Sequence, residues 1–209
     1  MQIRKAAEKD FPQMLPIYER ARQFMRETGN PNQWKDCDPK PEVILEGIRE
    51  GKMYLVMASE SDLVTNSESD VVTDAKMTKM NLMTGAKAHL TPGLAAERAE
   101  EKILGAFYFA LEEELTYRGI YDGKWMNEEP YGVIHRVASA GSGKGFAGAC
   151  FAWCEKQCLA ASCRNLRIDT HEDNKVMQHV LEKNGFTYCG KIHLKDGAER
   201  LAYQKVLGQ

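Results

Sequence analysis

Hydrophobic residues along this chain follow two spacings, one typical of strands and one typical of helices. Apolar runs, alternating or continuous, predict seven strands, at about 2–6, 53–58, 102–111, 131–139, 166–170, 186–192 and 201–206. Apolar residues at helical spacing predict four helices, at about 7–28, 41–50, 146–161 and 174–184. The order is strand, helix, helix, three strands, helix, strand, helix and two strands. This order predicts a mixed α/β fold with helices on both faces of one sheet.

One long segment, at about 59–101, departs from this pattern. Residues 59–75 hold five acidic side chains and no Lys or Arg, and no aromatic residue occurs between Tyr54 and Phe107. A segment with so little apolar surface cannot form a core of its own. We therefore predict a single domain over 1–209 with an insertion between two strands, which is flexible or lid-like.

Composition and charge set the broad class of the protein. Of the 209 residues 43% are hydrophobic, enough for a buried core, and 28 basic side chains balance 30 acidic ones. A net charge of −2 creates no bulk field that would attract nucleic acid or an anionic membrane. The first residues lack the apolar stretch of a signal peptide, and no window resembles a membrane span. We expect a cytoplasmic protein without nucleic-acid or membrane partners.

The six cysteines of the chain are interpreted as reduced thiols, because a chain of this length has its own core and needs no disulfide frame. Three of them, Cys150, Cys154 and Cys158, recur every four residues and form a stripe on a predicted helix. A metal site is one interpretation, and packing of a helix onto the sheet is the other. The absence of a CxxC pair and of a nearby His at ligand spacing favours packing, so no metal is expected.

The densest chemical signal is a glycine-rich turn at 138–149, between a predicted strand and a predicted helix. Glycines let the backbone approach a ligand closely, and a helix N-terminus offers unpaired N–H groups. The turn therefore indicates a phosphate-binding site. An ordinary glycine-rich connection is the alternative. Residues 143–148 also match GxGxxG, but only about 60 residues follow, and they end in a hairpin and not in further βαβ units.

Two motifs resemble those of the GNAT family of acyl-CoA-dependent N-acetyltransferases. Residues 142–147, Ser-Gly-Lys-Gly-Phe-Ala, resemble the family motif Arg/Gln-x-x-Gly-x-Gly/Ala after the fourth strand, and 168–174 with 185–186 resemble its next strand and helix. The element order is similar too, so the resemblance covers the chain except about 59–101. It implies an α/β (α+β) fold, a mixed, mostly antiparallel sheet of six to seven strands with helices on both faces and a splayed central parallel pair.

The chain departs from the family pattern at two positions. Ser142 stands where the phosphate motif has Arg or Gln, although Lys144 can supply a charge and most contacts expected there come from backbone N–H groups. Leu181 stands where many members carry a tyrosine that protonates the departing thiolate. The usual acid is therefore missing.

The resemblance also implies where acetyl-CoA binds as the acyl donor. Its pantetheine arm is expected between the two central parallel strands and its pyrophosphate over the glycine-rich turn, and a backbone N–H near Val137 is expected to stabilise the oxyanion. The residues implied in cofactor binding are Val137, Ala138, Ser139, Ser142, Gly143, Lys144, Gly145, Phe146, Ala147 and Asn174.

The attacking amine must lose a proton, and His135 on the fourth predicted strand is the first candidate for the base. A structural histidine is the alternative. Asp169 and His171, at the end of the fifth strand, are further candidates for a base or a substrate anchor. For the missing thiolate acid, Tyr188, Ser139 or water could substitute.

These residues predict an enzyme that moves an acetyl group from acetyl-CoA to a primary amine by direct attack in a ternary complex. The acceptor is expected to be a small-molecule or peptide amine that contacts Phe24, Trp34 and His171, although Trp34 could instead cover the edge of the core. A non-catalytic acyl-CoA-binding or regulatory module is the alternative. A third interpretation, an NAD(P)-dependent enzyme, is supported only by the GxGxxG match. We expect a monomer or homodimer.

Overall fold

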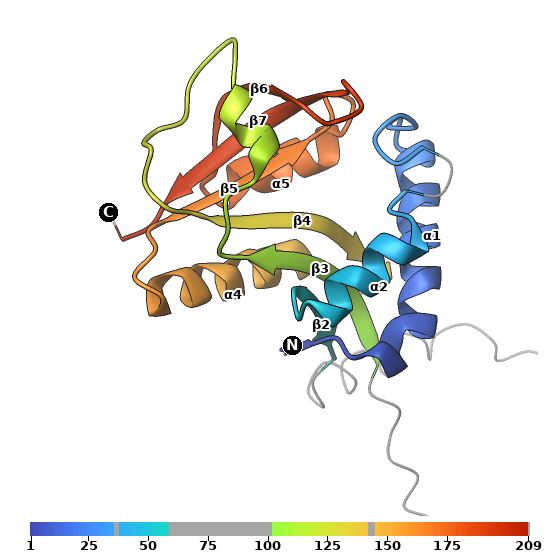
Figure 1. The fold of residues 1–209 in the computed structure, drawn as a ribbon. Helices are drawn as coiled ribbons and strands as arrows, with labels where there is room; N and C mark the ends of the chain where they lie inside the picture. The colour runs from blue at the N-terminus through green and yellow to red at the C-terminus, as the bar shows by residue number, and fades with distance from the viewer. Residues whose placement is uncertain (36–37, 59–101, 142–144, 209) are drawn as a thin grey trace, which may run out of the picture.

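A seven-stranded sheet, in the order β1-β2-β3-β4-β5-β7-β6, forms the centre of the molecule (Figure 1). The computed structural model describes residues 1–35, 38–58, 102–141 and 145–208. The strands are β1 (Gln2–Lys5), β2 (Met53–Met57), β3 (Ile103–Ala110), β4 (Gly132–Ser139), β5 (Asn165–Thr170), β6 (Thr187–His193) and β7 (Glu199–Val206). The helices are α1 (Phe11–Glu27), α2 (Pro41–Arg49), α4 (Phe146–Ala160) and α5 (Lys175–Lys183), with short 3-10 helices η1 (Glu8–Asp10) and η2 (Leu115–Gly119).

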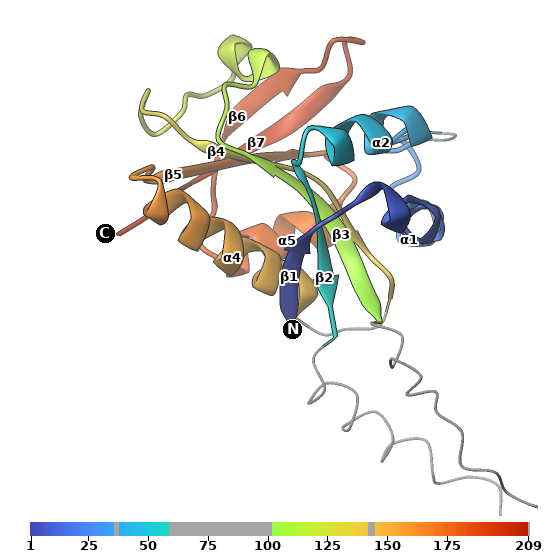
Figure 2. The same ribbon diagram turned by 60° about the horizontal axis from the view of Figure 1, so that its bottom comes forward.

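The predicted fold class is confirmed. β4 and β5 are parallel, and every other neighbouring pair is antiparallel. Helices α1 and α2 cover one face of the sheet, and α4 and α5 cover the other (Figure 2). Each face therefore has its own apolar core, as the helical and strand spacings predict. Among the described residues, no helix is long and apolar enough to cross a membrane.

The central parallel pair is very short. Only Gly132 to Ile134 of β4 pair with β5, and the two strands then diverge (Figure 1). β4 also carries a bulge, because the register with β3 jumps between His135 and Ala138. Arg136 lies in the bulge with φ +54°, a left-handed conformation that is uncommon for a residue with a side chain. The hydroxyl of Tyr18 donates a hydrogen bond to its carbonyl at 3.3 Å.

The cysteine stripe lies in the core between α4 and the sheet. Cys150, Cys154 and Cys158 are all fully buried together with the Phe151 ring. Burial raises the pKa of all three thiols, so they remain protonated at neutral pH. No group of three or more metal-binding side chains occurs among the described residues. The placement supports the packing interpretation.

The predicted insertion connects two neighbouring antiparallel strands, since β2 pairs directly with β3. Residues 59–101 themselves lie outside the described part of the chain. Their flexible or lid-like character, and the single-domain assignment of 1–209, stay predictions.

The close approach of α4 to the start of β4 leads to a testable prediction. A Cβ at Gly132 would lie 2.5 Å from the Cys158 sulfur and 2.8 Å from the Phe109 ring. We expect Gly132→Ala to lower the free energy of unfolding by about 1–3 kcal/mol, because this well-packed core must shift to admit a methyl group. Urea denaturation measures the change. Gly119→Ala is the matched control, since no atom lies within 4 Å of its added Cβ; equal losses in both variants would contradict the packing argument.

Candidate functional site

A cleft of about 550 Å³ opens where β4 and β5 diverge. β4 contributes Val137 and Ser139, α4 contributes Phe146 and Ala147, and α1 closes the remaining side. Asn174 and the first turns of α5 complete the wall. Several residues predicted to hold the cofactor are therefore brought together. Ala138 lies between two of them but is buried in the core on the α1 side.

The glycine-rich turn forms the end of this cleft. Gly145 precedes α4 with φ +83°, a conformation that favours glycine, and α4 starts at Phe146 with its N-terminal N–H groups near the turn. Residues 142–144, which include Ser142, Gly143 and Lys144, lie outside the described part of the chain. Their predicted cofactor contacts stay predictions.

Arg20 of α1 brings a positive charge to the same turn. A Cβ at Gly141 would clash with the Arg20 Nε, so the guanidinium packs directly on this glycine. Arg20 also lines the cleft, and no carboxylate forms an ion pair with it in the described ranges. A free guanidinium at a helix N-terminus is suited to an anionic group such as a phosphate.

Asn174 ties the cleft to the loop between α1 and α2. Its side-chain oxygen accepts a hydrogen bond from the N–H of Met177 at 3.0 Å and thereby caps α5. Its amide donates to Gln33 Oε1 at 2.7 Å. The carbonyl of Gln33 in turn accepts from Arg200 at 3.2 Å. One loop residue therefore contacts both the cleft and the residues around Asp169.

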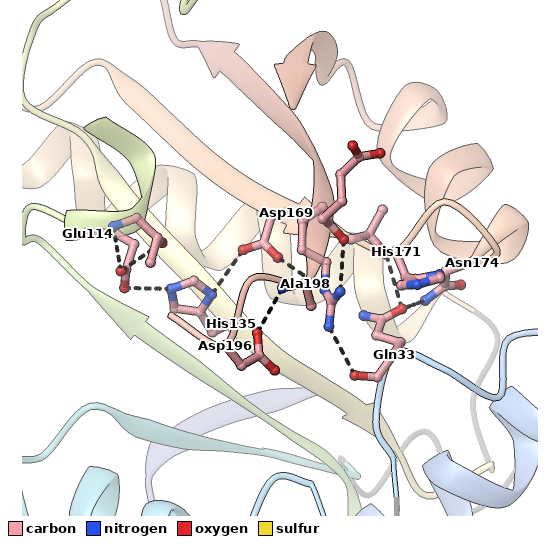
Figure 3. Close-up of polar contacts among 12 residues, drawn as sticks. Gln33, Glu114, His135, Asp169, His171, Asn174, Asp196 and Ala198 are labelled. Carbon is pink, nitrogen blue, oxygen red and sulfur yellow. Dashed lines mark hydrogen bonds and ion pairs between the residues drawn. The ribbon is translucent and has the colours of Figure 1, made fainter. Parts of the chain in front are cut away.

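His135 lies between two carboxylates (Figure 3). Its Nε2 is 3.4 Å from Glu114 Oε2, and its Nδ1 is 3.5 Å from Asp169 Oδ1. Nε2 is buried and makes no aligned hydrogen bond to any described residue. The imidazole thus has a carboxylate on each side, an arrangement that orients the ring.

Asp169 is held by further partners. The Tyr117 hydroxyl donates a hydrogen bond to Asp169 Oδ1 at 2.8 Å, and Arg200 Nε lies 4.0 Å from Oδ2. Tyr117 is fully buried, and burial together with the Asp169 charge raises the pKa of its hydroxyl well above the usual value. Tyr117 therefore stays protonated and acts as a donor to the carboxylate.

Glu114 precedes η2, and its contact with His135 changes its acidity. The His135 side chain is the largest cause that lowers the pKa of Glu114 to about 2, and hydrogen bonds from Thr116 act in the same direction. Partial burial opposes them. The backbone N–H of Glu114 donates to the Tyr131 hydroxyl at 2.9 Å, which fixes the start of η2 beside β4. Glu114 is therefore ionised wherever the protein is folded near neutral pH.

The structure does not bring Tyr188 to this group. Tyr188 pairs with Tyr203 across β6 and β7, and the Tyr203 ring belongs to the core beneath α4 and α5. His135 lies on the opposite face, beside the rings of Tyr108 and Tyr117. The sheet therefore separates Tyr188 from the predicted base.

The three predicted acceptor-binding residues lie at different places. Phe24 is half exposed and lines the cleft. Trp34 packs against Tyr18 with ring centroids 5.8 Å apart, at the edge of the α1 core. His171 follows β5, and its Nδ1 faces the N–H of Asp173 at 3.1 Å. Burial is the main cause that lowers the pKa of His171.

Glu114, Tyr117 and Arg20 are the residues that sequence reasoning missed. Glu114 and Tyr117 lie in the polar, irregular stretch at 112–130, which carries no periodic signal. Arg20 is one of several charged residues on an amphipathic helix. No motif in the sequence marks any of the three.

Comparison with solved structures identifies the fold. An acetyltransferase of the GNAT family from Streptococcus agalactiae is 27% identical, with a TM-score of 0.66 over 100% of this chain and 96% of that one. One from Listeria monocytogenes is 15% identical with a TM-score of 0.60, covering 99% and 94%. A ribosomal-protein-alanine N-acetyltransferase from Brucella melitensis is 16% identical with a TM-score of 0.51, covering 99% and 100%. No family model matches the chain, and no curated protein matches it.

The fold is thus that of an acetyltransferase. More narrowly, the chain has the GNAT N-acetyltransferase fold, and the resemblance drawn from its motifs is confirmed. These similarities support acyl transfer as the general class of activity.

The Glu114–His135 contact predicts a pH-dependent stability. The pKa of Glu114 is lowered from 4.5 to about 2, so its stabilising effect is fully present above pH 4.5 and is lost as the pH falls through about 2. We expect Glu114→Gln to cost about 1–2 kcal/mol at pH 7, a modest figure because 27% of the side chain is exposed. Urea unfolding from pH 7 to pH 3 measures the loss, which should shrink below pH 4.5.

The neighbouring Glu113→Gln is the matched control. Glu113 forms an exposed ion pair with Arg118, so its replacement should change stability by less than about 0.5 kcal/mol. A loss in Glu114→Gln that stays constant down to pH 3 would contradict the assigned contact.

Proposed function

We propose that this protein is an N-acetyltransferase that transfers the acetyl group of acetyl-CoA to a primary amine in a ternary complex. One observation carries the proposal: Val137 of β4 lines the cleft and lies two residues from a histidine held between two carboxylates. A binding cleft for a long thioester and a proton acceptor thus meet on one strand. Acetyl-CoA supplies an activated acetyl thioester, and acetyl transfer to the amine nitrogen releases the CoA thiol.

The residues present fit an acyl-CoA. The α4 N-terminus, the Gly141 backbone and the Arg20 guanidinium provide donors for the pyrophosphate. The apolar side chains of Val137 and Phe146 line the cleft beside the polar groups of Ser139 and Asn174. This combination of apolar walls and a few polar groups matches a pantetheine arm, which carries amides on an alkyl chain.

The bulge on β4 provides a group for the oxyanion. Val137 has no partner in the register with β3, and the pairing with β5 ends at Ile134. Its backbone N–H is proposed to donate to the thioester oxygen as negative charge develops there.

His135 is proposed to accept the proton of the attacking amine. Glu114 and Asp169 hold the ring from both sides and balance the positive charge that it gains. Tyr117 and Arg200 in turn keep Asp169 in place.

The departing thiolate has no tyrosine on α5. Leu181 is fully buried in the core, so this helix position offers no proton donor to the cleft. Ser139 lines the cleft and Tyr188 does not, and we therefore propose Ser139 or water as the proton source.

The acceptor is proposed to be a small-molecule amine or a peptide amine, with Phe24, Trp34 and His171 as its contacts. Phe24 is exposed at the cleft, as a substrate contact requires. A monomer or homodimer is the proposed assembly. The second candidate is an acyl-CoA-binding module without turnover, which the leucine at position 181 favours.

The role of His135 is tested by His135→Asn. We expect kcat to fall by about 10²- to 10⁴-fold while acetyl-CoA binding is unchanged, because the base is lost but the cleft remains. Thiol release with a panel of amines measures turnover, and calorimetry measures binding. His179→Asn, an exposed change on α5, is the control. A wild-type protein that binds acetyl-CoA but releases no thiol with any amine would favour the binding module.

The role of Arg20 is tested by comparing two acyl donors. We expect Arg20→Ala to weaken binding of acetyl-CoA by about tenfold, because a charge-assisted contact to phosphate is lost. Binding of S-acetylpantetheine, which lacks the pyrophosphate, should not change. Arg26→Ala on the same helix is the control, since Arg26 pairs with Glu19 outside the cleft. Equal weakening of both donors would show that Arg20 supports the fold and not the phosphate.

A further inference from the structure

A second cavity, of about 490 Å³, lies beside the start of β4, between the 112–131 segment and the end of α4. Apolar walls come from Leu111, Ile120 and the ring of Trp125. Tyr117 also lines it with its ring, while its hydroxyl points to Asp169. Neither His135 nor Glu114 lines it, so this cavity is separate from the proposed catalytic residues.

Arg167 of β5 is the unusual feature of this cavity. Its side chain lies between two aromatic rings, with its guanidinium carbon 4.1 Å from the centroids of both Trp125 and Tyr131. The residue is only 4% exposed, and it lines the cavity. One nitrogen donates to the carbonyl of Asn127 at 2.6 Å, whereas the buried Nε has no acceptor among the described residues.

No described carboxylate lies within ion-pair distance of this charge, and Glu128 on the rim attracts it only at longer range. Within the part of the chain that the structure describes, no ion pair within 4.0 Å involves Arg167, whereas the other buried arginine, Arg200, has Asp169 beside it. A buried cation without a counterion is costly, and the two aromatic faces provide only part of the lost solvation. The Arg167 guanidinium is therefore ready to bind a carboxylate that enters the cavity.

The rim of the cavity carries the opposite charge. Glu128 and Glu129 are exposed there and form no ion pair with any described residue, whereas Glu113 is paired with Arg118. An anion without a positive group would be repelled at this rim. A molecule that carries both a carboxylate and an ammonium group complements the deep arginine and the acidic rim together.

We propose that this cavity binds a free α-amino acid with an apolar side chain. Its carboxylate contacts Arg167, its ammonium group contacts Glu128 and Glu129, and its side chain packs against Leu111 and Ile120. The site is distinct from the acetyl-CoA cleft, and the proposal does not depend on the reaction that the protein catalyses.

The test uses the tryptophan fluorescence of the full chain, to which Trp125 in the cavity wall contributes together with Trp34 and Trp153. L-leucine, L-isoleucine, L-valine, L-methionine and L-phenylalanine are titrated into the full chain, and calorimetry gives the affinities. At least one is expected to bind saturably. For an L-leucine site, 4-methylpentanoate and 3-methylbutylamine should each bind about tenfold more weakly, because each lacks one of the two charged groups. Absence of binding by all five amino acids, or equal binding of the analogues, would overturn the proposal.

Variants locate the site. Arg167→Met keeps an unbranched side chain between the two rings and removes the charge, and it should weaken binding by about tenfold or more. The double change Glu128→Gln and Glu129→Gln lies on the surface and should weaken binding without affecting the fold. Arg118→Gln, on the same rim, is the control and should bind normally. Binding that survives in Arg167→Met but is lost in His135→Asn would place the amino acid at the proposed acceptor site and overturn the proposal.

Discussion

The arrangement of the site depends on one constraint, the early end of the pairing between β4 and β5. A parallel pair that continued past Ile134 would close the sheet where the cleft opens. The bulge at Arg136 follows directly after the paired residues, and its left-handed backbone costs about 1–3 kcal/mol. The Tyr18 hydroxyl on its carbonyl and the Tyr108 ring 5.0 Å from its guanidinium carbon stabilise the bulge from the α1 side. The strained backbone of β4 therefore depends on the packing of α1 against it.

The ionisable groups around β4 also depend on one another. His135, Asp169 and Arg200 lie in sequence across neighbouring strands, and each is partly or fully removed from water. Burial makes each charge depend on its neighbour, since the loss of one partner leaves the other without solvation. Gln33 extends this network to the α5 N-cap, so the loop after α1, the cleft and the histidine are mechanically connected.

Much of the fold could be predicted from the sequence, because its elements begin and end at strong local signals. Gly185 ends α5 at φ +81°, and Asp196-Gly197 turns β6 into β7. The glycine-rich turn likewise predicted the break between β4 and α4. Such signals are local, so they can be recognised without knowing which residues lie across the sheet.

The remaining site residues could not be predicted, because their positions depend on distant contacts. Glu114 lies in a stretch without periodicity, and a hydrogen bond from its backbone to Tyr131 helps to hold it beside His135. The sequence places Tyr188 on a late strand, but a period of two does not tell which face of the sheet a residue occupies. Its face is set by pairing with Tyr203, on a strand that follows later in the chain.

Three arginines show how surroundings, and not residue type, decide what a charge can do. Arg20 is exposed beside a glycine turn, so it can meet a phosphate at little cost. Arg200 is buried beside Asp169, which balances its charge and leaves it a structural role. Arg167 is equally buried but has aromatic rings in place of a carboxylate. The two rings attract the cation but leave its buried Nε without an acceptor among the described residues, so this guanidinium keeps capacity to bind an anion while the protein holds it in place. A rigid, desolvated donor of this kind binds a carboxylate with little loss of conformational freedom, which is the property a selective site requires.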